Sequence, residues 1–210
     1  MRLYLSSFRT GAHTDALLAM AAGRRTALVP NAADAWPADV RADVVRRDLD
    51  DLGAVGLDVT LADLRRPGTV DTLADYDILW LRGGNVFMLR RVLADSGADT
   101  VLLDLLRDDA LVYGGYSAGA CVLAGDLTGL THVDDPGVVT DPLMTGLGLL
   151  DRPFVPHVRS PGHPETAECD EVSAAYTAAG QPHWALRDGE VLVVDGGRTE
   201  LLRCDGAAPR

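Results

Sequence analysis

Short apolar runs alternate with amphipathic stretches along the first half of the chain, and this alternation limits the possible folds more than any other feature. The predicted strands cover residues 3–7, 26–30, 57–61, 77–81 and 111–113. The predicted helices cover residues 14–22, 38–52, 85–94 and 100–108. Strands that alternate with helices form a parallel sheet with helices on both faces. We therefore predict an α/β fold, a three-layer sandwich with a mostly parallel central sheet.

The last part of the chain has a different pattern. Three short strands are predicted at 185–187, 191–194 and 200–203, separated by Asp-Gly and Asp-Gly-Gly turns. We expect them to form an antiparallel meander that closes one edge of the sheet. No linker or repeat interrupts the 210 residues, so we predict a single domain over 1–210, with a loose tail from residue 207.

Composition excludes several kinds of function. All 19 basic residues are arginine, so a Schiff-base lysine, a Ser-Lys dyad and a P-loop lysine are impossible. The net charge of −12 argues against nucleic acid and anionic membranes as partners. The three cysteines form no C-x-x-C pair, so neither a zinc site nor another metal or cofactor is predicted. Without a long apolar segment or a signal peptide, the expected location is the cytoplasm.

The sequence Gly115-Tyr116-Ser117-Ala118-Gly119 is a G-x-S-x-G motif between a predicted strand and a predicted helix. A sharp strand-to-helix turn of this kind exposes a nucleophilic serine. A second glycine turn, Gly83-Gly84, ends another predicted strand and precedes Asn85, a good helix N-cap. Ligands of open α/β sheets bind beyond the carboxyl ends of the strands. We therefore predict Ser117 as nucleophile, the N–H groups of Gly84 and Ala118 as an oxyanion hole, and Asn85 as a substrate-binding residue.

The serine needs a base, which in a chain without lysine is expected to be histidine. His157 follows the apolar run 153–156 at a predicted strand end, where it could reach the serine. His132 is the main rival by position, whereas His13, His163 and His183 are expected to be solvated or structural. A carboxylate should orient the base. Among the aspartates between the serine and the histidine, Asp135 is preferred, with Asp134 in reserve and Asp126 and Asp141 as outside candidates.

Three motifs in this order resemble peptidase E, the aspartyl dipeptidases: Gly83-Gly84-Asn85-x-Phe87-x-Leu89, Gly115-x-Ser117-Ala118-Gly119-Ala120, and Pro156-His157. The resemblance covers most of the chain and implies a fold like that of the class I glutamine amidotransferases. It implies a metal-independent serine peptidase that hydrolyses short peptides, with a Ser117–His157–Asp135 triad and an acyl-enzyme. The implied substrate is a dipeptide with an acidic first residue (Asp-X), and a homodimer is compatible with the sequence.

One segment departs from the family pattern. Aspartyl dipeptidases carry a stretch resembling G-H-x-G-E-T-R, whose arginine is associated with the acidic side chain of the substrate. The chain has Gly-His-Pro-Glu-Thr-Ala at 162–167, one residue shorter and ending on alanine. Arg159 is the proposed substitute, because a guanidinium can bind a carboxylate with two hydrogen bonds.

Other functions stay open. An esterase or amidase could use the same triad, and a catalytically silent binding protein could use the same scaffold. The related cyanophycinases tend to be longer, and a full α/β-hydrolase would place more strand–helix units between Ser117 and His157.

Overall fold

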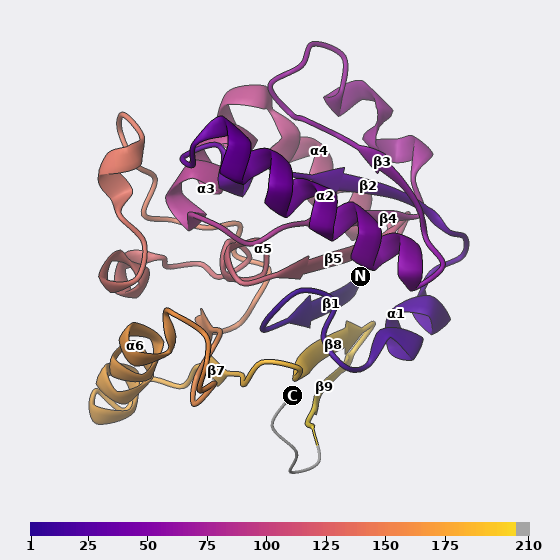
Figure 1. The fold of residues 1–210 in the computed structure, drawn as a ribbon. Helices are drawn as coiled ribbons and strands as arrows, with labels where there is room; N and C mark the ends of the chain where they lie inside the picture. Colours follow the sequence, from indigo (N-terminus) through magenta and orange to yellow (C-terminus); the bar gives the residue numbers. More distant parts are fainter. Residues whose placement is uncertain (205–210) are drawn as a thin grey trace.

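The computed structural model describes residues 1–204, so the predicted loose tail lies outside the described residues. Its main element is a seven-stranded sheet in the order β3-β2-β4-β5-β1-β8-β9 (Figure 1). The seven strands, in chain order, are β1 (Arg2–Ser6), β2 (Arg25–Val29), β3 (Asp58–Leu61), β4 (Ile78–Leu81), β5 (Val112–Tyr116), β8 (Val191–Asp195) and β9 (Arg198–Leu202).

The first five strands are mutually parallel, and the last two form an antiparallel hairpin. β8 pairs antiparallel with β1 and so attaches the hairpin to one edge of the parallel part. β1 and β4 flank β5, which ends at Tyr116 immediately before the serine of the G-x-S-x-G motif. The predicted mostly parallel α/β fold with an antiparallel edge is confirmed.

Helices cover both faces of the sheet, which produces three layers (Figure 1). Helices α1 (Thr14–Met20) and α2 (Ala38–Ala54) lie over one face. The other face is covered by α3 (Val86–Ser96), α4 (Ala98–Arg107) and the short α5 (Ala118–Cys121). Four 3-10 turns connect these elements: η1 (Asn31–Ala33), η2 (Val70–Asp75), η3 (Thr128–His132) and η4 (Pro136–Val138).

The inner strands contribute side chains to two separate cores, because successive residues of a strand point to opposite faces. In β2, Ala27 and Val29 pack under α3–α5, whereas Leu28 packs under α2. In β4, Leu79 and Trp80 divide in the same way. Strands buried on both faces explain why the runs recognised in the sequence are continuously apolar rather than alternating.

One prediction for the C-terminal part is wrong. The segment predicted at 185–187 does not join the meander: β7 (Trp184–Ala185) pairs in parallel with β6 (Phe154–Val155) in a separate two-stranded sheet. The N–H groups of Trp184 and Leu186 donate to carbonyls of Pro153 and Val155 on the neighbouring segment. Helix α6 (Thr166–Ala178) packs on this small sheet through a third apolar cluster. The Asp-Gly turn misled the prediction, because a tight turn does not require that its two arms pair with each other.

Within residues 1–204, none of the helices combines the length and the apolar character that crossing a lipid bilayer requires.

Candidate active site

Ser117 occupies a strained turn between β5 and α5. Its backbone has φ 49° and ψ −120°, a conformation that costs on the order of 1–3 kcal/mol and persists only where the surrounding structure enforces it. The glycines on either side permit the turn, since a Cβ on Gly119 would lie 2.0 Å from the carbonyl oxygen of Leu81 and one on Gly115 would lie 2.9 Å from it. Ser117 is partly exposed, although its immediate neighbours are buried. The motif thus has the nucleophile-elbow geometry expected from the sequence.

The second glycine turn lies directly beside the elbow. A Cβ on Gly83 would approach Cβ of Ser117 to 3.0 Å. Gly84 has φ 138°, a conformation for which glycine is suited, and a Cβ there would lie 2.5 Å from the carbonyl oxygen of Ala32. Ala118 is the first residue of α5, so its N–H has no acceptor inside the helix. The structure therefore brings the backbone of both predicted oxyanion-hole residues to the turn that carries Ser117.

His157 is buried at the end of the small sheet, with only 1% of its surface exposed and a positive φ of 58°. Its Nδ1 lies 2.7 Å from Oδ1 of Asp188. Its backbone N–H donates to Oγ of Ser7 over 2.8 Å, and the Ser7 hydroxyl donates to the same Asp188 oxygen over 2.8 Å. A carboxylate at Nδ1 holds the proton there and leaves Nε2 as the basic nitrogen. This is the tautomer that a general base needs.

The prediction that Asp135 orients His157 is wrong, and so is the reserve, Asp134. Asp135 caps η4, where its carboxylate accepts from the Gly137 N–H over 2.8 Å. Asp134 accepts from the Val86 N–H over 2.8 Å. The carboxylate that contacts His157 comes from Asp188, which lies after the histidine in the chain and not between serine and histidine. In the sequence, Asp188 is marked only by the Asp-Gly pair to which it belongs, and such a pair is equally typical of an ordinary turn.

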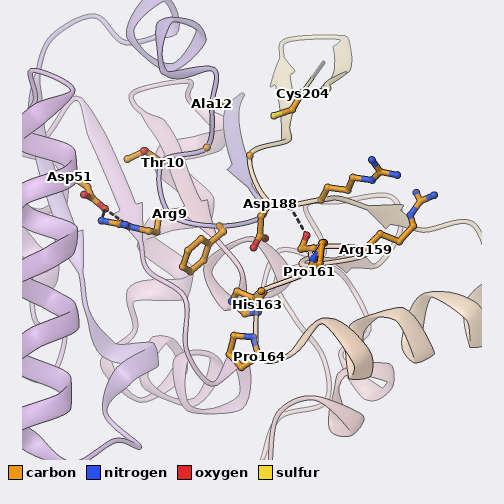
Figure 2. Close-up of a pocket in the computed structure, with 16 residues that line it drawn as sticks. Arg9, Thr10, Ala12, Asp51, Arg159, Pro161, His163, Pro164, Asp188 and Cys204 are labelled. Carbon is orange, nitrogen blue, oxygen red and sulfur yellow. Dashed lines mark hydrogen bonds and ion pairs between the residues drawn. The ribbon is translucent and has the colours of Figure 1, made fainter. Parts of the chain in front are cut away.

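The two predicted substrate-binding residues lie elsewhere. Asn85 is the N-cap of α3: its Oδ1 accepts from the Met88 N–H over 2.9 Å, and its Nδ2 donates to the Asp135 carbonyl over 2.9 Å. Both ends of its amide are therefore occupied. The exposed Arg159 points away from His163 and lines the larger groove described below, not the cavity that contains Ser117 (Figure 2). The structure brings neither side chain to the serine.

A cavity of about 220 Å³ contains the elbow. Ser117, the Gly83-Gly84 turn and His157 line it together with residues of the 163–165 segment. Beside it lies a larger groove of about 1040 Å³ (Figure 2), and Phe8, Arg9, His163 and Pro164 line both. Asp188 lines the groove, whereas His157 lines the cavity. Because the two share four lining residues, a short peptide bound beside the serine could extend from the cavity toward the groove.

A buried charged network supports the wall of the cavity. Nε of Arg82 lies 2.7 Å from Oδ2 of Asp48, and the hydroxyl of Tyr116 donates to the other Asp48 oxygen over 2.9 Å. Burial is the main cause of the raised pKa of both Asp48 and Tyr116, and the Arg82 charge opposes it. The pair is nine-tenths or more buried, so breaking it would leave an uncompensated buried charge. The network holds Tyr116 in place, one residue before the nucleophile.

His163 covers His157. The two imidazole rings are stacked, with centroids 3.5 Å apart and planes inclined by 5°, and Phe8 meets both rings edge-on. Burial, together with the charge of His157, lowers the pKa of His163 to about 4, so this ring is neutral at physiological pH. Sequence reasoning had placed His163 in an exposed turn, because the sequence Pro-Gly-His-Pro carries no sign of the ring beneath it.

His157, His163 and Glu165 are the described residues that come nearest to a metal-binding group, with one potential ligand atom each within 4.8 Å of one another. The geometry suits an ion poorly. The lone pairs of the two nearly parallel rings lie in separate planes, with centroids 3.5 Å apart, so they cannot both point at one ion. In addition, Nδ1 of His163 already accepts from the Glu165 N–H over 3.3 Å. The arrangement fits a covered catalytic base better than a zinc centre.

Comparison with known proteins identifies the family. The model of peptidase family S51 matches residues 6–202. A peptidase of Listeria innocua serovar 6a that has not been characterised is 24% identical over 174 residues, which are 82% of each chain.

Two solved structures share the fold. One is a protein from Listeria monocytogenes EGD-e assigned as a peptidase E, with a TM-score of 0.82 and 20% identity over 97% of this chain and 98% of that one. The other is a peptidase from an acI-B1 Actinobacterium, with a TM-score of 0.68 and 14% identity over 95% and 86% of the two chains. With the family model matching nearly the whole chain, the protein belongs to peptidase family S51 and is a serine-type peptidase.

Proposed function

We propose that this protein hydrolyses short peptides through an acyl-enzyme, with Ser117 as nucleophile, His157 as general base and Asp188 as the acid that orients the base. The observation that carries the proposal is the 2.7 Å contact between His157 Nδ1 and Asp188, made by a histidine that shares a cavity with the serine of a strained elbow. A hydrogen bond between Ser117 Oγ and His157 is not formed among the described residues. Such contacts are often long before substrate binds.

The proposed reaction proceeds in two stages. Nε2 of His157 takes the hydroxyl proton of Ser117 while Oγ attacks the carbonyl carbon of the scissile bond. The N–H groups of Gly84 and Ala118 stabilise the resulting oxyanion, an effect worth about 3 kcal/mol per donor. The imidazolium, stabilised by Asp188, returns the proton to the departing amine and leaves an acyl-serine. Water, activated by the same base, then releases the acid and regenerates the serine.

The size of the cavity supports a short substrate, and its charges bear on specificity. Three arginines line it: Arg82 is paired with Asp48 and Arg9 with Asp51. The exposed Arg47 makes no ion pair within residues 1–204. A dipeptide with an acidic first residue remains the narrower form of the proposal, and Arg47 is better placed than Arg159 to receive a carboxylate of that substrate.

The test is cleavage of X-Leu dipeptides, with X being Asp, Glu, Ala, Leu or Arg, by the wild type and by Ser117→Ala. We expect turnover of at least one dipeptide and a loss of about 10⁴-fold or more in the variant. Unchanged cleavage by Ser117→Ala would refute the mechanism. Hydrolysis of p-nitrophenyl esters without any dipeptide would favour an esterase. Failure of Ser117 to react with a fluorophosphonate would favour a silent binding protein.

A further inference from the structure

Two arginines are held side by side just beyond the small sheet. Residues 158–160 and 186–188 lie next to each other and are joined by two hydrogen bonds, of 3.0 Å and 2.8 Å, one at each end. The middle residues of the two segments are Arg159 and Arg187, so the two arginines are neighbours. Arg159 is also held at a positive φ of 50°, which the surrounding structure must enforce. Like charges on neighbouring segments repel each other, so this placement costs free energy unless an anion binds there.

The described residues supply no anion to either guanidinium group. Within residues 1–204 neither side chain forms an ion pair or a hydrogen bond, whereas most other arginines pair with an aspartate or a glutamate. Asp170 and Glu190 lie close in the chain, but they accept from the backbone N–H groups of Arg159 and Arg187, over 2.8 Å and 2.9 Å. Two adjacent cations without a partner favour an anionic ligand.

Both arginines line the larger groove, which lies on the side of the site from which the first product departs. Its wall includes Asp188, His163 and Phe8, whose side chains contact the ring of His157 (Figure 2). In the proposed reaction the base returns its proton to the departing amine, so the leaving part of the substrate lies beside this ring. A leaving peptide that extends from the cavity therefore enters the groove that carries the arginines.

The terminal carboxylate of a dipeptide is too close to the scissile bond to reach them. It lies two bonds, or about 2.5 Å, from the departing nitrogen, and so it stays at the Nε2 edge of His157. Arg187 lies beyond the opposite edge, because it directly precedes the aspartate that contacts Nδ1. Each further extended residue adds about 3.3–3.6 Å, so a leaving peptide of two or more residues is needed. The groove of about 1040 Å³ has room for it, whereas the cavity at the serine measures about 220 Å³.

We propose that Arg159 and Arg187 together bind carboxylates of the leaving peptide, so that the enzyme favours peptides longer than a dipeptide whose carboxyl-terminal segment is acidic. A guanidinium group can bind a carboxylate with two hydrogen bonds, which suits this pair of side chains. The inference rests on the proposed function and names the substrate class of the same site. The carboxylate that Arg159 binds then lies after the scissile bond and not before it, as the sequence had suggested.

The experiment compares cleavage of X-Leu-Glu-Glu with that of X-Leu-Gln-Gln-amide, where X is the best first residue of the dipeptide panel. The two peptides have the same length and differ only in their carboxylates. We expect kcat/KM of the wild type to be about tenfold higher for the acidic peptide, mainly through a lower KM. In the double variant Arg159→Gln/Arg187→Gln the ratio should fall to about one. Arg66→Gln is the matched control and should keep the ratio, since Arg66 is exposed, unpaired within residues 1–204 and outside both cavities.

Two outcomes would overturn the inference: equal kcat/KM for the two peptides in the wild type, or the same preference in the double variant. The ratio is informative even if the double variant is less active, because both peptides use the same serine and base. Calorimetric titration of Ser117→Ala with Leu-Glu-Glu and Leu-Gln-Gln-amide tests the groove without turnover. Tighter binding of the acidic peptide, lost when both arginines are also replaced, supports the anion site even if the proposed peptidase activity fails. Equal binding, or none of either peptide, refutes it.

Discussion

The two halves of the active site are positioned in different ways. Around Ser117 the backbone does the positioning: the strained turn is held between glycines that let the end of β4 pass within van der Waals distance. Around His157 side chains do it: Asp188 from the loop before β8 contacts the imidazole, and Ser7 from the end of β1 accepts from the backbone N–H of His157 and donates to Asp188. A substitution that disturbs the backbone around Ser117 should therefore lower both stability and activity. A substitution that removes a side-chain hydrogen bond near His157 should lower activity and leave the fold intact.

The largest effect is expected on the histidine side. Replacing Asp188 by Asn keeps the size of the side chain but presents an amide to Nδ1, so the imidazole can adopt the wrong tautomer. We expect kcat to fall by about 10⁴-fold, the size of effect known for such a change in a serine-protease triad. Thermal unfolding should change little. Asp135→Asn is the control, since its carboxylate only caps η4, and it should retain activity. The opposite ranking of these two variants would restore Asp135 as the triad acid.

On the elbow side, Gly119→Ala should act through the fold. The added methyl group would meet the backbone of Leu81 at 2.0 Å, and a strand in the centre of a sheet cannot move away. We expect a loss of about 3 kcal/mol in the free energy of unfolding, the upper part of the range for overpacked cores. Gly125→Ala, with open space around its Cβ, is the control. Urea denaturation measures the free energy of unfolding of both variants. If Gly119→Ala were as stable as the wild type but inactive, the backbone around Ser117 would not be positioned by the fold in the way described.

Asp134 tests whether an acid beside the elbow serves stability instead of catalysis. Burial raises its pKa to about 7, above the ordinary value of 3.8. The folded state therefore binds this proton more tightly than the unfolded state, and stability is lost as the pH rises from about 4 through about 7.

Asp134→Asn should remove that loss and keep an acceptor for the Val86 N–H. At pH 8 the variant should be more stable than the wild type by on the order of 2 kcal/mol, about half the ceiling set by the pKa shift. Chemical denaturation at pH 5 and pH 8 checks this, and a gain that is equal at the two pH values would contradict it.

The smallest effect is expected at Ser7. Ser7→Ala removes the hydroxyl that links the His157 N–H to Asp188, but leaves the direct contact between histidine and aspartate in place. We expect kcat/KM to fall about tenfold and stability to fall by about 1–2 kcal/mol, because a buried N–H loses its acceptor. Ser96→Ala, far from the site at the end of α3, should leave kcat/KM unchanged. A loss as large as that of Asp188→Asn would mean that Ser7 takes part more directly.

The sequence by itself determined the parts of this protein that depend on local pattern. Apolar runs bounded by turns located β1, β2, β4 and β5, because strands buried on both faces are largely apolar, and the exposed edge strand β3 was located by its turns and its place in the alternation. The G-x-S-x-G motif located Ser117, and the Gly83-Gly84 turn located its neighbour, because such close backbone approaches require glycine. His157, predicted as the base because it follows a short apolar strand, lines the same cavity as Ser117.

Only the tertiary structure decided which side chains meet His157. Asp188 follows it by 31 residues and Ser7 precedes it by 150. Their contacts depend on β6 pairing with β7 and on β8 returning beside β1, which no local pattern specifies. The same pairing leaves His163 stacked on the base and Glu165 unpaired in the cavity. Hydrogen bonds between distant segments depend on three-dimensional position rather than on spacing along the chain, and for this reason a nearby aspartate in the sequence was mistaken for the partner of the histidine.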